Sequence, residues 1–286
     1  MTERGYKLVD WPQARNPVVD LLEAAHQKHN IAAAWEIDFS EAYARMRRIR
    51  RQTGVAVSLN AYLAFALGRA VAKHPMLQAV RQGKRLVLYD GVDVATAIDY
   101  TEAGQPPRAV GARVANADTR SLAEICVEMR RLAKQNPMER PALRWRAKIG
   151  RYPRPIRRII WRWIDGNPAR RRQMRGTVGL TNLNFLLDRR RPVHGFPHAP
   201  YTATLCVGSL YDRALPAPDR PGGVAFSKFL CVSLVVDHDI IDGAAAAHFA
   251  RTLSFFVEAG EGLDDAFARE LAALSPSKVT RHAVVS

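Results

Sequence analysis

The stretch FLCVSLVVDHDIIDG, residues 229–243, decides how the chain is organised. Its first eight residues carry no charge, so they predict a central strand that is covered on both faces. Three aspartates and His238 stand at the mouth of that strand, followed by Gly243 and an expected helix. Because open sheets present functional groups at the carboxyl ends of their strands, this turn is a candidate site.

A histidine in this turn suits general base catalysis, because an imidazole ordinarily titrates near about pH 6.5. Asp242, four residues later, could cap the following helix or fix the loop that orients the imidazole. Two other interpretations stay open: His238 can be a surface histidine in an acidic turn, or the acids can be metal ligands. Asp237 and Asp239 alternate about His238 and would point away from it in an extended chain, so we expect no metal.

Strands and amphipathic helices alternate through the rest of the chain. Residues 59–71 place seven apolar side chains at helical spacing, with Ser58 as a candidate cap and Pro75 as a stop. Ser121 and Glu124 have the spacing of a capping box and predict a second helix. The other expected elements are strands over 31–39, 85–99 with a turn at 90–91, 176–183 and 202–210, and helices over 155–164 and 243–260. This alternation predicts an α/β or α+β fold built on a large mixed sheet.

Length and composition are those of an ordinary globular protein. The 286 residues are 48% apolar and 24% charged, which excludes a wholly disordered chain and a fibrous repeat. Cys126, Cys206 and Cys231 have no close pair among them, so we expect neither a disulfide framework nor a C-x-x-C metal site. We find no signal peptide and no apolar run long enough to span a membrane, so a cytoplasmic location is expected.

The net charge of +16 is concentrated in one segment. Residues 144–175 hold twelve of the 43 lysines and arginines against a single acid, Asp165. Such a block attracts polyanions, for example a phosphorylated donor, an acidic carrier protein or an anionic membrane. Four aromatic residues interleave with the arginines, which is also typical of a membrane-surface helix. A solvated basic excursion is an equally open interpretation, and no nucleic-acid motif accompanies the segment, so we expect no nucleic-acid partner.

Other nucleophile systems find little support in the sequence. There is no G-x-S-x-G elbow, and the glycines of 176–182 fit neither a dinucleotide fingerprint nor a P-loop. Cys206 and Cys231 lie within apolar strands and are expected to be small core residues. His194 and His198 lie in a proline-rich loop and are expected to be solvated.

The motif and its context together resemble a known family. DHDIIDG is similar to the H-x-x-x-D-G signature of the chloramphenicol acetyltransferase-like superfamily, and the chain looks closest to the catalytic domain of the dihydrolipoamide acyltransferase subunit of 2-oxo acid dehydrogenase complexes. SLNAYLAFALGRAVAKHP resembles the family's helix that ends in Lys-His-Pro, and GTVGLTNLNF resembles its G-T-F-T-I-S-N-L-G strand. The resemblance covers roughly residues 15–260, with 140–175 as an apparent insertion.

The resemblance implies a fold, an assembly and a site. The fold would be a two-layer α/β sandwich with a large mixed sheet, assembled as a homotrimer with active sites between subunits. His238 would match the catalytic histidine, the base that deprotonates the group attacking a thioester carbonyl. Thr181 falls where the family places a hydroxyl that donates to the tetrahedral oxyanion, although threonine is also simply a good strand former. Asp242 would hold the motif loop, and Asp237 and Gly243 would support it.

These implications predict a stand-alone acyltransferase. It would move an acyl group from CoA, or from an acyl-carrier protein, to a hydroxyl, amine or thiol, with CoA as a substrate and no tightly bound cofactor. We expect one catalytic domain over 1–286 with a frayed tail at about 275–286, because no lipoyl or peripheral-subunit-binding domain is recognised. The family usually has a basic residue directly after the histidine, where this chain has Asp239.

Two alternatives remain open at the level of the sequence. The chain can be a catalytically silent trimeric scaffold or a membrane-associated adaptor that uses residues 144–175 as its working surface. It can also transfer acyl groups onto lipoyl domains of a separate chain.

Overall fold

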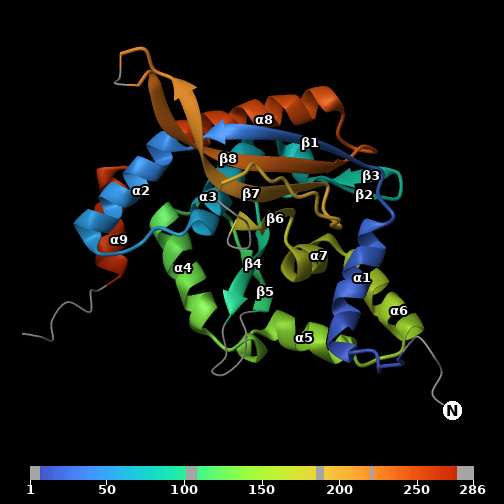
Figure 1. Ribbon diagram of the computed structural model, residues 1–286. Helices are drawn as coiled ribbons and strands as arrows, with labels where there is room; N and C mark the ends of the chain where they lie inside the picture. The colour runs from blue at the N-terminus through green and yellow to red at the C-terminus, as the bar shows by residue number, and fades with distance from the viewer. Residues whose placement is uncertain (1–6, 101–107, 185–189, 220–221, 276–286) are drawn as a thin grey trace, which may run out of the picture.

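A mixed sheet organises the protein, whose computed structural model describes residues 7–100, 108–184, 190–219 and 222–275 (Figure 1). Its strands are β1 (Asn30–Asp38), β4 (Val94–Tyr100), β5 (Arg108–Val114), β6 (Val178–Asn182), β7 (Ala203–Pro216) and β8 (Val224–Asp237). The six strands lie in the order β1-β8-β7-β6-β4-β5, with β6 parallel to both neighbours and the other pairs antiparallel. A separate hairpin joins β2 (Val80–Gln82) to β3 (Arg85–Val87). The predicted large mixed sheet is therefore confirmed.

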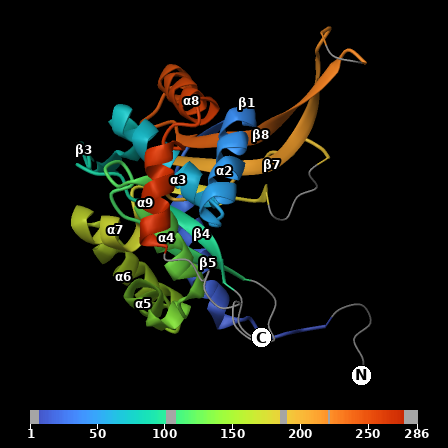
Figure 2. The ribbon, with the colours of Figure 1, turned by 90° about the vertical axis from the view of Figure 1, so that its left-hand side faces the viewer.

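One face of the sheet carries most of the hydrophobic core. The helices over this face are α2 (Ser40–Thr53), α3 (Leu59–Lys73), α4 (Leu122–Lys134) and α8 (Gly243–Glu258), and α9 (Asp265–Leu274) packs against α2 and α4 (Figure 2). Alternate residues of each strand point into this layer, as the period of a strand requires. In β6, Val178 and Leu180 join the core, so Gly179 and Thr181 face the other side of the sheet.

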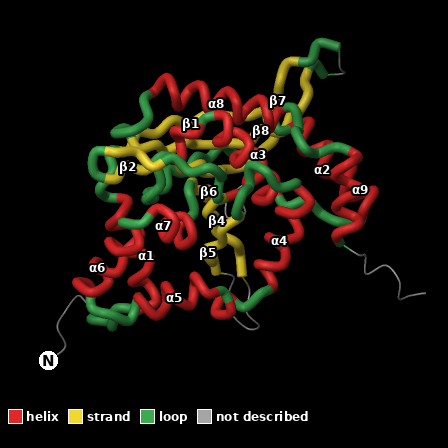
Figure 3. The backbone as a smooth tube through the Cα atoms, turned by 180° about the vertical axis from the view of Figure 1, so that it is seen from behind, coloured by secondary structure: helices red, strands yellow, loops and turns green. Residues whose placement is uncertain are grey.

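The segment expected as an insertion forms three helices on that other side. They are α5 (Pro141–Ile149), α6 (Arg154–Asp165) and α7 (Pro168–Arg175). Helices α5 and α7 lie near β4 and β5, and α6 lies beside α1 (Asn16–Ala25) farther from these strands (Figure 3). Ile149, Trp161 and Ile164 form a small hydrophobic core of their own. The basic segment is thus a folded layer with its own interior.

Gly179 shows how tightly the loop before β7 packs on β6. A Cβ atom at this position would lie 2.8 Å from the Tyr201 ring and 2.8 Å from the Thr204 hydroxyl. Real Cβ contacts of this length essentially do not occur, so any larger residue would push the loop away from β6. The close approach shapes the surface beside Thr181.

The predicted elements are confirmed with differences at their ends. The capping box of Ser121 and Glu124 is present in full. The prediction of a side-chain cap at Ser58 is wrong, because the residue holds the cap position of α3 but its side chain makes no cap hydrogen bond. The strand predicted over 202–210 continues to residue 216, because β7 and β8 pair beyond the core as a long ribbon.

Two further expectations concern the ends of the chain and the membrane. Residues 276–286 of the tail expected to fray lie outside the described residues. In the part of the chain that is described, no helix has both the length and the apolar character needed to cross a bilayer.

Candidate active site

The motif turn continues the ladder between β1 and β8. Asn30 pairs with Asp237 at the end of the ladder, and the backbone N–H of His238 donates to the carbonyl of His29 at 2.8 Å one step farther on. The buried Asp237 carboxylate forms an ion pair with Lys28, whose side chain is also largely buried. The position of His238 is therefore fixed by the first residues of β1 as well as by its own strand.

The turn also sets the tautomer of His238. The N–H groups of Ile240 and Ile241 donate to the Asp237 carbonyl at 3.1 and 3.0 Å, which closes the turn after β8. The imidazole Nδ1 then lies 2.9 Å from the carbonyl oxygen of Ile241. A carbonyl oxygen can only accept, so Nδ1 carries the proton. The Nε2 atom is left with a free lone pair on an exposed ring, which is the form that a general base needs.

Asp242 caps the helix that follows the motif. Its side chain accepts a hydrogen bond from the Ala245 N–H at 2.8 Å, and α8 begins at Gly243. Of the two local roles open to Asp242, the structure shows the helix cap. The carboxylate therefore holds the end of the motif loop through α8.

Asp239 contacts the residue before β1. Its carboxylate lies 2.9 Å from Nδ1 of His29, and both side chains are exposed. The hydrogen bond that His29 donates to the Asp239 carboxylate raises the pKa of His29 and lowers the pKa of Asp239. The two acids that flank His238 thus have separate partners, Lys28 for Asp237 and His29 for Asp239.

The group with metal-ligand spacing lies elsewhere. Among the described residues, ligand atoms of Glu36, His194 and Cys231 fall within 4.8 Å of one another. These atoms already have protein partners, since Glu36 accepts from the Tyr211 hydroxyl at 2.7 Å and Nδ1 of His194 donates to the Val232 carbonyl at 3.1 Å. The expectation of a solvated His194 is wrong, because the ring is half-buried against β8. No sequence pattern predicts this cluster, because its members are far apart along the chain.

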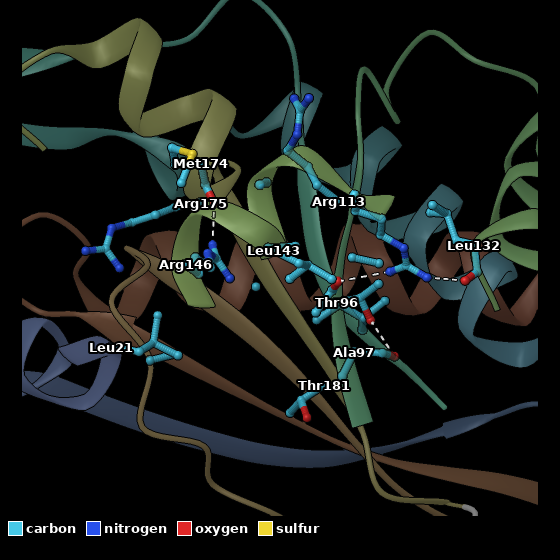
Figure 4. Close-up of a pocket in the computed structure, with 18 of the residues that line it drawn as sticks. Leu21, Thr96, Ala97, Arg113, Leu132, Leu143, Arg146, Met174, Arg175 and Thr181 are labelled. Carbon is cyan, nitrogen blue, oxygen red and sulfur yellow. Dashed lines mark hydrogen bonds between the residues drawn. The ribbon is translucent and has the colours of Figure 1, made fainter. Parts of the chain in front are cut away.

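Thr181 lies in the wall of a cavity of about 650 Å³ (Figure 4). Strands β4, β5 and β6 form one wall and residues of α5 another. The half-buried Thr181 hydroxyl makes no hydrogen bond with any described residue, so it is free to donate to a bound molecule. The resemblance placed an oxyanion donor at Thr181, and the structure puts that hydroxyl at a cavity of substrate size.

The structure does not bring Thr181 and His238 together within one chain. Thr181 pairs with Cys206 on β7, Cys206 pairs with Ser233 on β8, and His238 lies five residues beyond Ser233. Two strand spacings and five residues of rise separate the two side chains by roughly 20 Å. A site that uses both groups must therefore take them from different subunits.

Several arginines of the basic segment are internal ties. Arg157 is buried and lies 3.0 Å from both carboxylate oxygens of Asp20 on α1. Arg175 is also buried and donates to Asp165 at 2.8 and 3.0 Å. The interpretation of residues 144–175 as a solvated basic surface is wrong for these side chains, because their partners lie inside the molecule.

A third tie joins α7 to the start of β4. The carboxylate of Asp93, fully buried, accepts from Arg172 at 3.0 Å and from the Asn116 N–H at 3.0 Å, and it pairs with Arg113. Burial alone would raise the pKa of Asp93, but the hydrogen bonds from Arg172 and Asn116 outweigh it and the pKa is lowered. Asp93 therefore stays ionised and holds the helical segment to the sheet.

Comparison with known proteins identifies the relatives of this architecture. Residues 5–140 match the family model of the 2-oxoacid dehydrogenases acyltransferase (catalytic domain). A comparison with curated proteins found no match. Solved structures with a similar fold include two dihydrolipoamide acetyltransferases and one catalytic core of a 2-oxoacid dehydrogenase complex. A probable dihydrolipoamide acetyltransferase from Listeria monocytogenes 4b F2365 aligns with a TM-score of 0.62 and 19% identity over 90% of this chain and 96% of that chain.

The other two come from different organisms. The dihydrolipoamide acetyltransferase of Azotobacter vinelandii aligns with a TM-score of 0.64 and 19% identity over 91% of this chain and 94% of its own. That structure was determined to examine a serine, a histidine and an asparagine in the catalytic mechanism. A truncated catalytic core of the 2-oxoacid dehydrogenase complex from Thermoplasma acidophilum aligns with a TM-score of 0.60 and 18% identity over 90% of this chain and all of its own.

These comparisons confirm the resemblance and the two-layer α/β fold predicted from the sequence. The family model that matches is that of an acyltransferase catalytic domain, and the match covers residues 5–140 of the 286. The match to the family model ends at residue 140, immediately before α5, so the three helices of the basic segment lie beyond it.

Proposed function

We propose that this acyltransferase-type chain moves an acyl group from CoA, or from a carrier-protein thioester, to a hydroxyl, amine or thiol acceptor. The observation that carries the proposal is the hydrogen bond from Nδ1 of His238 to the Ile241 carbonyl at 2.9 Å. It presents Nε2 as a base on an exposed ring, and a hydrogen bond from the His238 backbone N–H to the His29 carbonyl holds the same residue.

The chemistry needs two groups of this chain. Nε2 of His238 removes the proton from the acceptor as the acceptor attacks the thioester carbonyl carbon. The carbonyl oxygen becomes an oxyanion, which accepts a hydrogen bond from the Thr181 hydroxyl. When the tetrahedral intermediate collapses, the carbon–sulfur bond breaks and the leaving thiolate takes the proton from the imidazolium.

The spacing in a relative supports the same assignment. In the Azotobacter vinelandii protein the examined histidine and asparagine stand four positions apart. In this chain Asp242 stands four positions after His238 and caps α8. We assign Asp242 the task of holding the loop that carries the base.

We further propose that the working form is a homotrimer. Thr181 and His238 are separated by roughly 20 Å along β6 and β8 of one chain, so the complete site requires a second subunit. We also expect the protein to act outside a dehydrogenase complex. The support for this is Asp239, which stands where the family usually has a basic residue.

The test is an acyl-transfer assay on the purified protein with His238→Ala. We expect the rate to fall by about a thousandfold while the oligomer stays intact in sedimentation, because general base catalysis typically contributes a factor of about 10² to 10⁴. His248→Ala is the matched control, since His248 is an exposed histidine on α8 outside the motif. Wild-type rates for His238→Ala would refute the mechanism.

A second function, association with an anionic membrane, is favoured by the outer face of α6. Ile156, Ile159 and Trp163 follow one another at helical spacing and are 44%, 66% and 59% exposed. Arg158 and Arg162 are exposed beside them. An apolar stripe bordered by cations fits the boundary between headgroups and acyl chains.

Vesicle sedimentation distinguishes this function from simple solvation. We expect the wild type to bind phosphatidylglycerol vesicles and not phosphatidylcholine vesicles, and Ile159→Glu to lose binding. Phe255→Glu is the control, because Phe255 is equally exposed, at 66%, on the distant helix α8. Equal behaviour of the two variants, or no binding by the wild type, would remove this function.

A further inference from the structure

The cavity beside Thr181 is mostly apolar, but three of the arginines that line it lack a carboxylate partner among the described residues. Its apolar walls come from Leu21, Leu132, Leu143 and Met174. Three of its other charged side chains are paired: Arg113 with Asp93, Arg175 with Asp165, and Glu128 with Arg120. Within the described ranges, Arg131, Arg140 and Arg146 line the cavity without an ion pair. Arg131 is exposed, whereas Arg140 and Arg146 each have a buried Nε atom with no hydrogen-bond partner.

Arg140 is held by neutral groups alone. Its side chain is buried, with the residue 8% exposed. One guanidinium nitrogen donates to the Gly111 carbonyl at 3.3 Å and another donates to the Leu132 carbonyl. Its Nε atom is buried with no hydrogen-bond partner in the structure. Carbonyl oxygens satisfy some of its N–H groups, but they leave a full positive charge uncompensated.

Arg146 also lacks an anionic partner, and it too lies beside Gly111. Its Nη2 atom donates to the Met174 carbonyl, and its buried Nε atom has no partner (Figure 4). Its Nη1 atom would lie 3.6 Å from a Cβ built on Gly111. Both guanidinium groups therefore border the same glycine of β5. Burial lowers the pKa of each arginine, which is the expected effect of holding a cation away from water without an anion.

The position of Gly111 sets a distance to Thr181. Gly111 pairs with Ala97 on β4, and the β4–β6 ladder, which pairs Thr96 with Leu180, places Ala97 opposite Thr181. Two strand spacings separate Gly111 from Thr181, about 10 Å. The extended pantetheine arm of CoA carries its phosphates farther than this from the thioester sulfur. An anion that reaches Gly111 while a carbonyl reaches Thr181 thus belongs to the acyl group or to the acceptor.

We infer that Arg140 and Arg146 bind an anionic group, a carboxylate or a phosphate, at the far end of an elongated apolar acyl group or acceptor. This inference rests on the proposed function, since it places the reacting carbonyl at Thr181. The apolar walls take the body of the molecule, and the forked guanidinium groups take the anion. The substrate class is therefore an amphiphilic acid rather than a neutral chain.

Binding tests the site without any turnover. The protein is His238→Ala, and the probes are octanoate, octyl phosphate and the neutral octanamide, compared by calorimetry at one ionic strength. We expect both anions to bind at least tenfold more tightly than octanamide, and Arg146→Met, introduced into His238→Ala, to remove that preference. Arg144→Gln, at an exposed arginine of α5 with no described partner, should keep it. Equal affinity for octanoate and octanamide in the parent protein would overturn the inference whether or not Arg146→Met folds.

Kinetics then separates the two sources of the anion and the two proposals. If the anion belongs to the donor, the mono-CoA thioester of octanedioic acid should exceed octanoyl-CoA in kcat/KM by tenfold or more in wild type, and this preference should vanish in Arg146→Met. If it belongs to the acceptor, 8-hydroxyoctanoate should exceed octanol in kcat/KM by a similar factor.

Binding of anions without any acyl transfer would refute the proposed function but not the anion site, whereas acyl transfer without any preference for anions would refute the anion site. Loss of the trimer in Arg146→Met, with no binding of anions by the parent protein, would assign the arginines to contacts between subunits.

Discussion

The turn after β8 and the α5–α7 segment are both rich in charge, yet they use it in opposite ways. In the turn, His238 and Asp239 are exposed, and the polar contacts of the motif run to residues at the start of β1 or within the turn itself. In the α5–α7 segment, Arg157, Arg171 and Arg175 are among the buried residues. The charged groups of the turn are accessible to a substrate, whereas buried arginines of the basic segment form ion pairs within the fold.

The difference lies in where the partners come from. The His238 ring finds its acceptor three residues away, so the contact is encoded within the motif. Arg157 finds Asp20 at a sequence separation of 137 residues. A dense run of arginines therefore predicts the net charge of a segment, but it does not predict whether the charged groups face solvent. Arg140 and Arg146 show a third use, in which a buried cation is left for a ligand.

The largest expected effect tests whether the turn completes its site with a second subunit. His238→Ala and Thr181→Ala should each abolish most activity alone. Hybrid trimers formed by unfolding and refolding an equal mixture should regain about one quarter of the wild-type rate, because about one interface in four then receives an intact histidine and an intact threonine. The measurement is the rate of acyl transfer per active-site equivalent.

The control for hybrid formation is a mixture in which both chains carry His238→Ala. It has no intact base at any interface and should stay inactive. If mixtures of the two single variants also stay inactive while exchange of subunits is verified by mass, Thr181 and His238 do not share a site across subunits.

The next largest effect concerns the internal ties of the basic segment. Asp20→Asn removes the charge that faces Arg157 and also weakens the acceptor of the Trp161 indole N–H, which lies 3.0 Å from Asp20. Breaking one side of a buried ion pair leaves an uncompensated charge, so we expect the free energy of unfolding to fall by about 3 kcal/mol. Urea denaturation followed by tryptophan fluorescence measures the change.

Asp265→Asn is the matched control for a surface pair. Asp265 lies 3.3 Å from Arg48, and its side chain is 74% exposed. Exposed pairs contribute about 0 to 1 kcal/mol, so this variant should be close to the wild type. If Asp20→Asn were as stable as Asp265→Asn, the α1–α6 tie would contribute little to the stability of the protein.

The same contrast explains what the sequence could predict. The strand before the motif, the capping box at Ser121 and the helix after Gly243 follow from local patterns and are present as expected. The cap at Ser58 failed because the preference of a residue for a position does not guarantee its hydrogen bond. The site residues His238 and Thr181 came from the motif and the family resemblance.

The part of the site that the sequence did not predict, Arg140 and Arg146, depends on contacts between residues that are distant along the chain. Arg140 and Arg146 lie close together because both side chains reach Gly111 on β5, about thirty residues earlier in the chain. Their lack of a carboxylate is a property of the packed structure. The signal in the sequence, a dense run of arginines, was present but did not separate these two from the arginines that have acids.

The smallest expected effect is a pH-dependent one at the turn, between Asp239 and His29. Asp239→Asn should lower the melting temperature slightly, and the difference from the wild type should depend on pH. Because the folded-state pKa of His29 is raised, its contribution is complete below about pH 6.5 and is lost as the pH rises through the raised value. Because the folded-state pKa of Asp239 is lowered, its contribution is complete above about pH 4 and is lost as the pH falls through the lowered value.

The pH dependences of His29 and Asp239 together define a pH window. The melting temperatures of Asp239→Asn and the wild type should differ most between about pH 4 and about pH 6.5, and less at pH 8. His29→Ala should reproduce the effect, and the double variant should add nothing, since both changes remove the same contact. Both side chains are exposed, so added salt should reduce the difference. A difference that is constant from pH 4 to pH 8 would mean that the Asp239 side chain supports the turn independently of the charge on His29, since Asp239→Asn keeps the backbone N–H that lies 3.4 Å from the Asp237 carboxylate.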